Sequence, residues 1–168
     1  MKRLELKTRM VDNLKFIVDN NVGKLAKWLR MVGYDAIFFD GSDDAYLVAK
    51  ALAEDRMILT RDTQIMKRGI ITSGRLKAIL IDSDKAEPQI RQVIDKLHLD
   101  YQSRPFTRCL ECNQPLTERN KEEIKDRVPP YVFQTQSQYM ECPACHRIYW
   151  RGTHWQSMNR KIKNLTES

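Results

Sequence analysis

Three aspartates stand next to predicted strand ends, where their side chains could act together. Asp19 directly follows a short apolar run, Asp62 comes two residues after the predicted strand at 57–60, and Asp44 opens the helical segment that follows another strand. Because the carboxyl ends of parallel strands share one edge of a sheet, we expect these groups to lie close together. Clustered carboxylates repel one another unless a cation neutralises them, and magnesium or manganese, which prefer oxygen ligands, would do so. Such an ion can activate a water molecule and stabilise an in-line attack on a phosphodiester.

Each of these aspartates has a purely structural explanation as well. Asp43 or Asp44 could cap the helix that follows, and Asp62 could cap the short turn after it. Asp19 is harder to explain in this way, because folding does not need an acid at the end of a buried strand. The asparagines at 20–21 are interpreted as ordinary turn residues. Acids at three successive strand ends nevertheless favour a shared site.

All the cysteines of the chain lie in its last third. They form two Cys-x-x-Cys pairs with 29 residues between them: Cys109 and Cys112, then Cys142 and Cys145. Four thiolates suit zinc, and a closed shell of four cysteines predicts a structural metal in a zinc ribbon with a looped-out insertion. A disulfide framework is disfavoured in a cytosolic chain, and redox-active pairs are seldom doubled. His146 and His154 are expected to make local hydrogen bonds and not to bind the metal.

Short apolar segments alternate with amphipathic ones along the first hundred residues. Strands are predicted at 16–18, 36–39, 57–60 and 78–81. Helices are predicted at 22–32, 45–54 and 64–67, with a last one from Pro88 to Leu97. This alternation is typical of an α/β fold whose parallel sheet is covered by helices on both faces.

The alternating pattern stops near 101–107, and we place a domain boundary there. Residues 15–100 form the first predicted domain, residues 105–158 the cysteine-bearing domain, and residues 159–168 a basic C-terminal tail. A polar arm or extra strand is predicted at 1–14. The length of 168 residues suffices for one modest domain with a small appendage.

The charge of the chain favours a polyanionic partner. A net charge of +7 and a pI near 9.3 indicate RNA or DNA before a membrane, although a basic surface can also serve solubility alone. A phosphate-binding rim is predicted from these basic residues of the first domain: Lys24, Arg30, Arg61, Lys67, Arg68, Arg75 and Lys77. Lys24, Lys27 and Arg30 are expected on the solvent side of their helix. The stretch 67–77 is expected to be a basic, glycine-bearing loop.

Arginines alternate with aromatic residues after the second cysteine pair. Arg147 and Arg151 are the basic members of this segment, and the mixture could bind phosphate and stack bases. Trp150 and Trp155 are instead expected to pack the small domain or to dock it on the first one. We therefore keep the two arginines as nucleic-acid-binding candidates.

No apolar run approaches the ~18 residues that a membrane span requires, and the basic N-terminus lacks an apolar stretch of signal-peptide length. A cytoplasmic location without a membrane partner is therefore expected.

Several stretches together carry a family resemblance. They are Phe-Ile-Val-Asp at 16–19, Lys-Leu-Ala-Lys-Trp-Leu-Arg-Met-Val-Gly-Tyr-Asp at 24–35, Asp-Ala-Tyr-Leu at 44–47, Ile-Leu-Thr-Arg-Asp at 58–62, the two cysteine pairs, and Ile-Tyr-Trp-Arg-Gly-Thr-His-Trp at 148–155. In this order they resemble the RNase-like family named for the C-terminal domain of the Mut-seven exonuclease (Mut7-C). The similarity runs from about Phe16 to Met158.

The resemblance implies a PIN-like, Rossmann-like nuclease domain followed by a small zinc ribbon. It implies a ribonuclease that uses magnesium or manganese, cleaves RNA to leave a 5′-phosphate and a 3′-hydroxyl, and carries a structural zinc. The family's acidic positions fall on Asp19, Asp44 and Asp62, and its zinc positions fall on the four cysteines. The fourth acid of a PIN site has no clear counterpart, and Asp82 and Asp84 are approximate candidates.

Two other function classes are compatible with the sequence. The first is a non-catalytic RNA-binding adaptor with a degenerate acidic site and the ribbon as its binding surface. The second is a phosphoacceptor signalling domain, since receivers also carry aspartates at strand ends. That site needs a lysine after a late strand, whereas here Ile81 leads to Asp82. An Asp19→Asn variant separates enzyme from adaptor, because only the enzyme loses RNA cleavage while keeping RNA binding.

Overall fold

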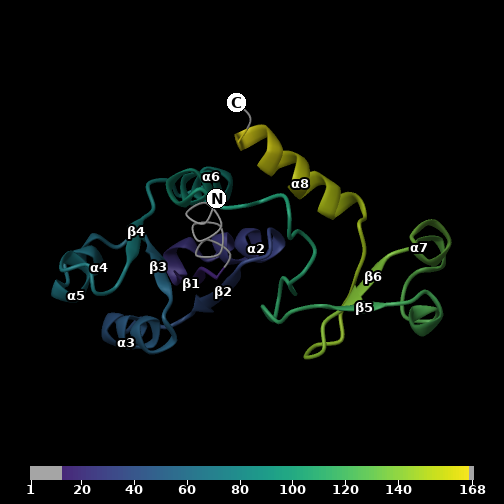
Figure 1. Cartoon of the computed structure of the whole chain (residues 1–168), viewed down its shortest axis with the longest axis horizontal. Helices are drawn as coiled ribbons and strands as arrows, with labels where there is room; N and C mark the ends of the chain where they lie inside the picture. The colour runs from purple at the N-terminus through teal and green to yellow at the C-terminus, as the bar shows by residue number, and fades with distance from the viewer. Residues whose placement is uncertain (1–12, 167–168) are drawn as a thin grey trace, which may run out of the picture.

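Four short strands form a fully parallel sheet: β1 (Lys15–Asp19), β2 (Asp35–Phe39), β3 (Met57–Thr60) and β4 (Ala78–Leu80). Their order is β2-β1-β3-β4 in this computed structural model, which describes residues 13–166 (Figure 1). The chain starts in the middle of the sheet, moves outward to β2 and then returns to the other side of β1. The strand order therefore reverses between β1 and β3, which makes this the topological switch point of the sheet.

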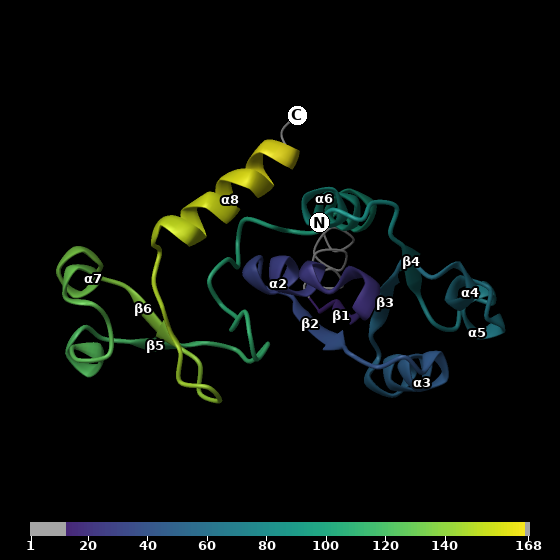
Figure 2. The same cartoon turned by 180° about the vertical axis from the view of Figure 1, so that it is seen from behind.

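Helices cover both faces of the sheet (Figures 1 and 2). One face packs against α2 (Lys24–Met31) and α6 (Ala86–Leu97), and the other against α3 (Asp44–Glu54), α4 (Thr63–Met66) and α5 (Gly69–Thr72). Successive strand residues point to opposite faces, so Phe16 and Val18 join the first core while Ile17 joins the second. The predicted α/β fold with a parallel sheet between helices is confirmed.

Two local differences from the predicted elements have clear causes. A 3-10 turn, η1 (Asn20–Val22), precedes α2, so this helix begins later than the predicted 22–32. The predicted basic loop at 67–77 contains α5, in which Thr72 N–H donates to the Arg68 carbonyl at 3.0 Å. The half-buried Ile70 and Ile71 of this short helix pack against the second core, which explains why the segment is helical.

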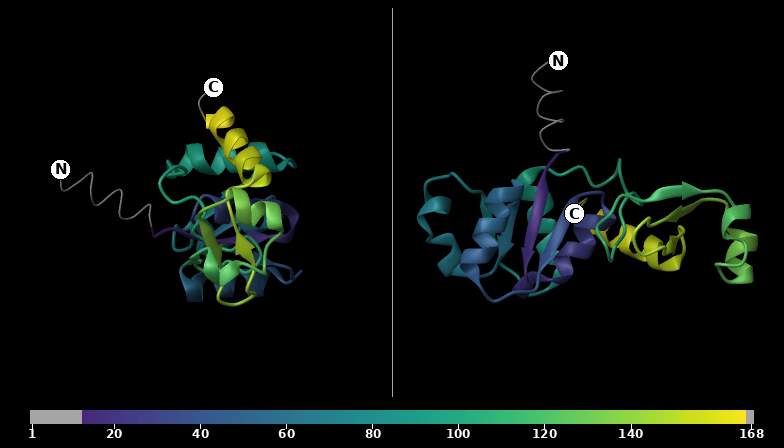
Figure 3. Two further views of the ribbon diagram at one scale, coloured as in Figure 1. Left: turned by 90° about the vertical axis from the view of Figure 1, so that its right-hand side faces the viewer. Right: turned by 90° about the horizontal axis from the view of Figure 1, so that it is seen from below.

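The second part of the molecule is an antiparallel sheet, here called the ribbon (residues 108–150). Its strands β5 (Thr117–Arg119), β6 (Tyr139–Glu141) and β7 (Ile148–Tyr149) pair in that order. The turn η2 (Glu122–Ile124) and helix α7 (Pro130–Thr135) occupy the insertion between β5 and β6, and their apolar residues pack a separate small core with Tyr139. Figure 3 shows that the ribbon extends away from the parallel sheet.

The C-terminal helix α8 (Thr153–Thr166) returns from the ribbon and lies against α6 (Figure 1). Ile162 is only 1 % exposed and belongs to the core of the parallel-sheet part, with Met158 one turn earlier packed on the same core. Lys161 and Glu87 form an ion pair at 3.3 Å across the two helices. The predicted boundary between residues 158 and 159 therefore falls inside a continuous helix.

The predicted arm at 1–14 lies outside the described residues except for positions 13 and 14. Within the described range, none of the helices combines the length and the apolar character that a bilayer crossing demands.

Candidate active site and cysteine cluster

Asp19 ends β1 at the switch point and is nearly buried, with 5 % of its surface exposed. Its Oδ2 accepts a 2.8 Å hydrogen bond from the hydroxyl of Thr60 at the end of β3, and its Oδ1 accepts one of 2.8 Å from the Asn20 N–H. These bonds fix the carboxylate at the edge shared by the two central strands. Within residues 13–166 it has no basic ion-pair partner, so a cation would compensate for the cost of burying this charge.

Asp62 is connected to Asp19 through Thr60. The Asp62 N–H donates to the Thr60 hydroxyl oxygen at 3.0 Å, and that hydroxyl donates to Asp19. Oδ1 of Asp62 accepts a 2.8 Å bond from the Gln64 N–H and so caps α4. The capping role considered from the sequence is thus real, but it uses one oxygen of the carboxylate. Thr60 was not predicted, and the only signal for it was a hydroxyl at the end of a buried strand.

Asp43, and not Asp44, caps α3. Its Oδ1 accepts bonds from the N–H groups of Ala45 at 2.9 Å and Tyr46 at 3.2 Å. Asp44 is the first residue of the helix and leaves the cap to its neighbour. Burial raises the pKa of Asp44, and the negative charges of the two other aspartates raise it further.

The structure brings the three predicted aspartates to one edge of the sheet, near enough for mutual repulsion. They are less tightly grouped than the cysteines, which alone among the described residues form a set of three or more potential ligands with all ligand atoms within 4.8 Å. In donor type and charge the aspartates suit a hard divalent cation, which would remove their repulsion.

Two asparagines tie the loops at this edge together. The amide of Asn20 donates to the carbonyl of Gly41 at 3.1 Å, in the loop after β2. Oδ1 of Asn21 accepts a 3.2 Å bond from the Arg61 N–H, directly after β3. The turn residues predicted at 20–21 therefore also fix the loops that carry the acidic side chains.

The basic residues predicted to form a rim differ in their surroundings. The positive charge of Arg68 lowers the pKa of Asp44 and opposes the effect of the neighbouring acids, which locates Arg68 near the acidic site. The other exposed members of the predicted rim are Lys24, Arg61, Lys67, Arg75 and Lys77. Their contact with nucleic acid stays a prediction.

Arg30 does not lie on the solvent side of α2, so that prediction is wrong. It is 8 % exposed, and its guanidinium donates to the carbonyl oxygens of Ala36 at 2.8 Å and Leu110 at 2.7 Å. The long side chain reaches past the helix into the junction with the ribbon, where its charge satisfies buried carbonyls. We therefore remove it from the proposed phosphate-binding rim.

Asp82 and Asp84 follow β4 and are exposed. The backbone N–H of Asp82 donates to Oε1 of Gln92 at 2.9 Å, which fixes this loop on α6. The charges with the largest effect on the pKa of Asp44 are those of Asp62, Asp19, Arg68 and Asp43. The structure thus gives no added support to either of them as a fourth acid.

The four cysteines meet at the base of the ribbon. Sγ of Cys109 and Sγ of Cys145 are 3.7 Å apart, close to the separation of about 3.8 Å that tetrahedral zinc–sulfur bonds of about 2.3 Å would give. The N–H of Cys112 donates to Cys109 Sγ at 3.3 Å, and the N–H of Cys145 to Cys142 Sγ at 3.5 Å. The cluster could hold a metal ion such as zinc.

The sulfur atoms cannot all ionise easily without a cation. Burial raises the pKa of Cys109, but the hydroxyl of Tyr149 and the N–H of Cys112 stabilise the thiolate more and bring the pKa to about 7. The hydrogen bond with Cys145, burial and the charge of Cys109 raise the pKa of Cys112 to about 12. A zinc ion removes this conflict because it binds thiolates.

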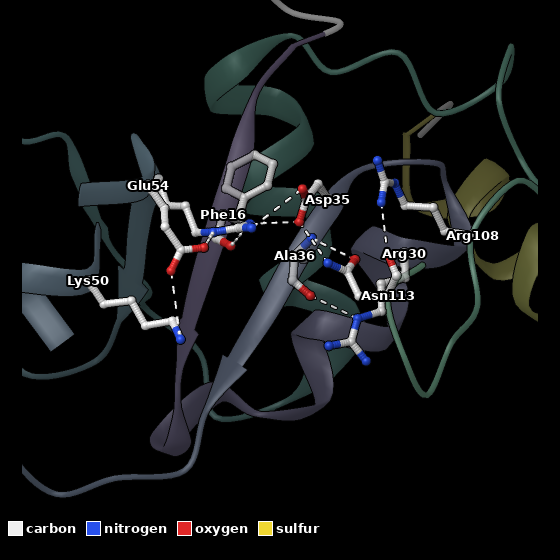
Figure 4. A network of polar contacts seen from close by, with 9 residues as sticks. Phe16, Arg30, Asp35, Ala36, Lys50, Glu54, Arg108 and Asn113 are labelled. Carbon is white, nitrogen blue, oxygen red and sulfur yellow. Dashed lines mark hydrogen bonds and ion pairs between the residues drawn. The ribbon is translucent and has the colours of Figure 1, made fainter. Parts of the chain in front are cut away.

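A buried polar network joins the first cysteine pair to the parallel sheet (Figure 4). Asn113 donates to Oδ1 of Asp35 at 2.7 Å and accepts a 3.0 Å bond from the Ala36 N–H. Burial raises the pKa of Asp35, but hydrogen bonds from Arg56 and Asn113 outweigh it and lower the pKa overall. This junction has no local signal in the sequence, because its partners lie about 80 positions apart in the chain.

The arginines after the second cysteine pair make different contacts. Arg147 lies 3.4 Å from Oε1 of Glu111. Arg151 stacks its guanidinium 4.9 Å from the Trp155 ring centre and 5.7 Å from that of Phe106. Trp150 packs on the ribbon core, as expected.

Comparisons with known proteins gave one match. A family model described as the Mut7-C RNAse domain matches residues 14–162, nearly the whole chain. The comparison with curated proteins and the comparison with solved structures found no significant match.

Proposed function

The chain belongs to the Mut7-C RNase domain family, and from this membership we propose that it is a metal-dependent ribonuclease whose acidic site is formed by Asp19, Asp44 and Asp62. Membership of the family supports a nuclease role with RNA as the substrate. The choice of metal and the roles of single residues are our proposal.

One observation supports placing the proposed active site at the acidic edge of the sheet. The nearly buried Asp19 stands at the switch point of the sheet and is joined through Thr60 to Asp62. The pKa of Asp44 is raised by burial and then by the charges of these two acids. A site of this kind, at the carboxyl ends of parallel strands, is where open α/β sheets bind ligands.

The three aspartates would hold magnesium or manganese. When bound, such an ion supplies a nucleophilic hydroxide and neutralises charge at the phosphorus. Thr60 keeps the Asp19 carboxylate in place, and the asparagine-anchored loops do so for the other two acids. The exposed Arg61, Lys67 and Arg68 would bind neighbouring phosphates of the RNA.

We propose a purely structural zinc for the cysteine cluster. Four cysteines complete a tetrahedral shell and leave no position for substrate. One zinc per chain is expected by native mass spectrometry, and it should be lost in Cys142→Ser but kept in His154→Ala. A chain that folds without any bound metal would contradict the proposal.

A second candidate, the non-catalytic RNA-binding adaptor, is favoured by the looser grouping of the aspartates compared with the cysteines. RNA cleavage decides between the two candidates. The wild type should cut a labelled single-stranded RNA with manganese present, and Asp19→Asn should still bind the RNA without cutting it.

Asp95→Asn is a matched control, because Asp95 is an exposed acid on α6 outside the proposed site. This control should keep full activity. Cleavage that survives in Asp19→Asn at the wild-type rate would exclude Asp19 from the reaction. A wild type that binds but never cleaves would favour the adaptor.

A further inference from the structure

A pocket of about 400 Å³ lies where the ribbon, its linker and α8 meet. Aromatic side chains from all three segments line it: Phe106 from the linker, Tyr131, Tyr149 and Trp150 from the ribbon, and Trp155 from α8. Phe106 and Trp155 contact edge to face, with ring centres 6.1 Å apart. The pocket therefore offers flat apolar surfaces held by the tertiary fold and not by one flexible loop.

One polar atom of a residue that lines the pocket lacks a partner. The indole Nε1 of Trp155 is buried and has no hydrogen-bond acceptor in the described part of the chain. Leaving a buried donor unpaired is costly, and such groups normally find an acceptor. A ligand with ring nitrogen or carbonyl acceptors would supply one, whereas an aliphatic side chain would not.

One cationic residue lines the pocket, and another stacks on an aromatic ring of its wall. Arg108 lines the pocket and donates to the carbonyl of Asn113 at 2.8 Å, so its position is tied to the first cysteine pair. The exposed Arg151 stacks on Trp155. Guanidinium groups beside aromatic rings attract both the π-face and the phosphate of a nucleotide. Tyr131 is 67 % exposed and presents its ring to solvent.

We propose that this pocket binds one unpaired nucleobase of single-stranded RNA, stacked on its aromatic rings and hydrogen-bonded to the indole N–H of Trp155. The inference rests on the proposed function for the nature of the ligand. It goes beyond that function because the pocket is separate from the acidic edge, so it would hold the strand at a second point.

The occupant is identified by the combination of features. A nucleobase is flat, has hydrogen-bond acceptors on its edge and carries a phosphate on either side, which matches the rings, the unpaired N–H and the arginines. An apolar protein segment would satisfy the rings alone. A second copy of this chain is the other alternative, and it would show as a dimer in solution.

The test measures RNA binding separately from cleavage. Asp19→Asn serves as the parent protein, and its affinity is compared for a single-stranded oligoadenylate and for an abasic oligoribonucleotide of the same length and charge. We expect the abasic strand to bind more weakly by about tenfold or more, the change that loss of base stacking brings.

Two pocket variants in this parent should remove the difference between the strands. Trp155→Ala deletes the ring and the N–H, and the exposed Tyr131→Ala changes the rim without disturbing the fold. Both should weaken binding of the oligoadenylate and leave the abasic strand unaffected. Trp155→Phe should give an intermediate loss because it keeps the ring and removes the donor. Trp28→Phe, on α2 and outside the pocket, is the control and should bind as the parent does.

Each result has a distinct meaning. The pocket proposal is overturned if the parent binds both strands equally, or if Trp155→Ala and Tyr131→Ala both keep the affinity of the parent. Cleavage of RNA by the wild type would still uphold the proposed function. If binding depends on the bases but the wild type never cleaves RNA, the nucleobase pocket is supported and the proposed ribonuclease function is rejected. A dimer in sedimentation that Tyr131→Ala dissociates overturns the proposal in favour of a second copy.

Discussion

The side-chain amide of Asn113 donates a 2.7 Å hydrogen bond to Oδ1 of Asp35, which joins the first cysteine pair to the start of β2. Asn113 follows Cys112 with a φ of 64°, and His146 follows Cys145 with a φ of 61°. The residue that follows each cysteine pair thus has a positive φ of nearly the same value. Among residues 13–166, hydrogen bonds into the parallel sheet come from the first pair's Asn113 and not from His146, so the two positions make a natural comparison.

Replacing Asn113 by glycine should destabilise the protein, whereas His146→Gly should not. Glycine readily adopts the left-handed conformation at both positions, so the backbone contribution is matched. Asn113→Gly also removes the bonds to Asp35 and to the Ala36 N–H, which should cost roughly 1–3 kcal/mol. Urea unfolding of the two zinc-loaded variants measures this difference. Equal stabilities would mean that the junction contributes nothing.

Arg30→Lys should lower stability without lowering RNA affinity. Lysine keeps the charge but cannot reach both carbonyls that Arg30 contacts, and the loss should cost roughly 1.5–3 kcal/mol. Lys27→Met, which breaks an exposed 2.8 Å ion pair with Glu111, should cost less than about 1 kcal/mol. Thermal unfolding and RNA titration of both variants test the assignment. A stable Arg30→Lys protein with impaired RNA binding would return Arg30 to the phosphate-binding rim.

Gly33→Ala should be far more damaging than Gly74→Ala. Both glycines have positive φ, 101° and 81°, which costs an alanine roughly 1–2 kcal/mol. At Gly74 an added Cβ meets nothing within 4 Å, whereas at Gly33 it would lie 2.4 Å from the carbonyl oxygen of Arg104. The linker to the ribbon crosses the end of α2 at this point and would have to move. Unfolding midpoints should therefore separate the two variants, and equal midpoints would show that the linker yields at no cost.

The parallel sheet could be predicted from the sequence because its signals are local. The apolar runs just before Asp19 and Asp62 are short and followed by helix-forming segments, so the strand ends were evident. Parallel pairing then predicted that these acids share an edge, as the structure shows. The spacing of the two Cys-x-x-Cys pairs was also sufficient to predict the cysteine cluster.

The junction between the sheet and the ribbon could not be predicted in this way. Arg30 lies outside the apolar stripe of its helix in the sequence pattern, as a solvent-facing residue would. Its burial depends on Leu110, eighty positions later in the chain. Asn113 and Asp35 are ordinary turn and strand-end residues in sequence terms, and only the tertiary fold pairs them. The start of α8 at Thr153 was missed for a related reason, since the helix is held by its packing on α6.

Asp44→Asn should stabilise the protein when no magnesium or manganese is present. The raised pKa means that the folded chain binds more protons than the unfolded chain between the ordinary value of 3.8 and the raised value. The stability of the folded protein therefore falls as the pH rises through this window. The destabilisation by the ionised Asp44 is absent below the window and complete above it. The variant has no carboxylate to titrate here, so at pH 7 its melting temperature should exceed that of the wild type by about 1–3 °C.

Asp43→Asn is the matched control, since it removes a neighbouring charge while asparagine still caps α3. The rise in melting temperature should be smaller for this control, because the charge of Asp43 raises the pKa of Asp44 less than those of Asp62 and Asp19 do. Manganese should raise the melting temperature of the wild type and of Asp43→Asn, and should raise that of Asp44→Asn much less, because the cation and the substitution relieve the same repulsion. A manganese response that is identical in all three proteins would show that the ion does not bind at Asp44.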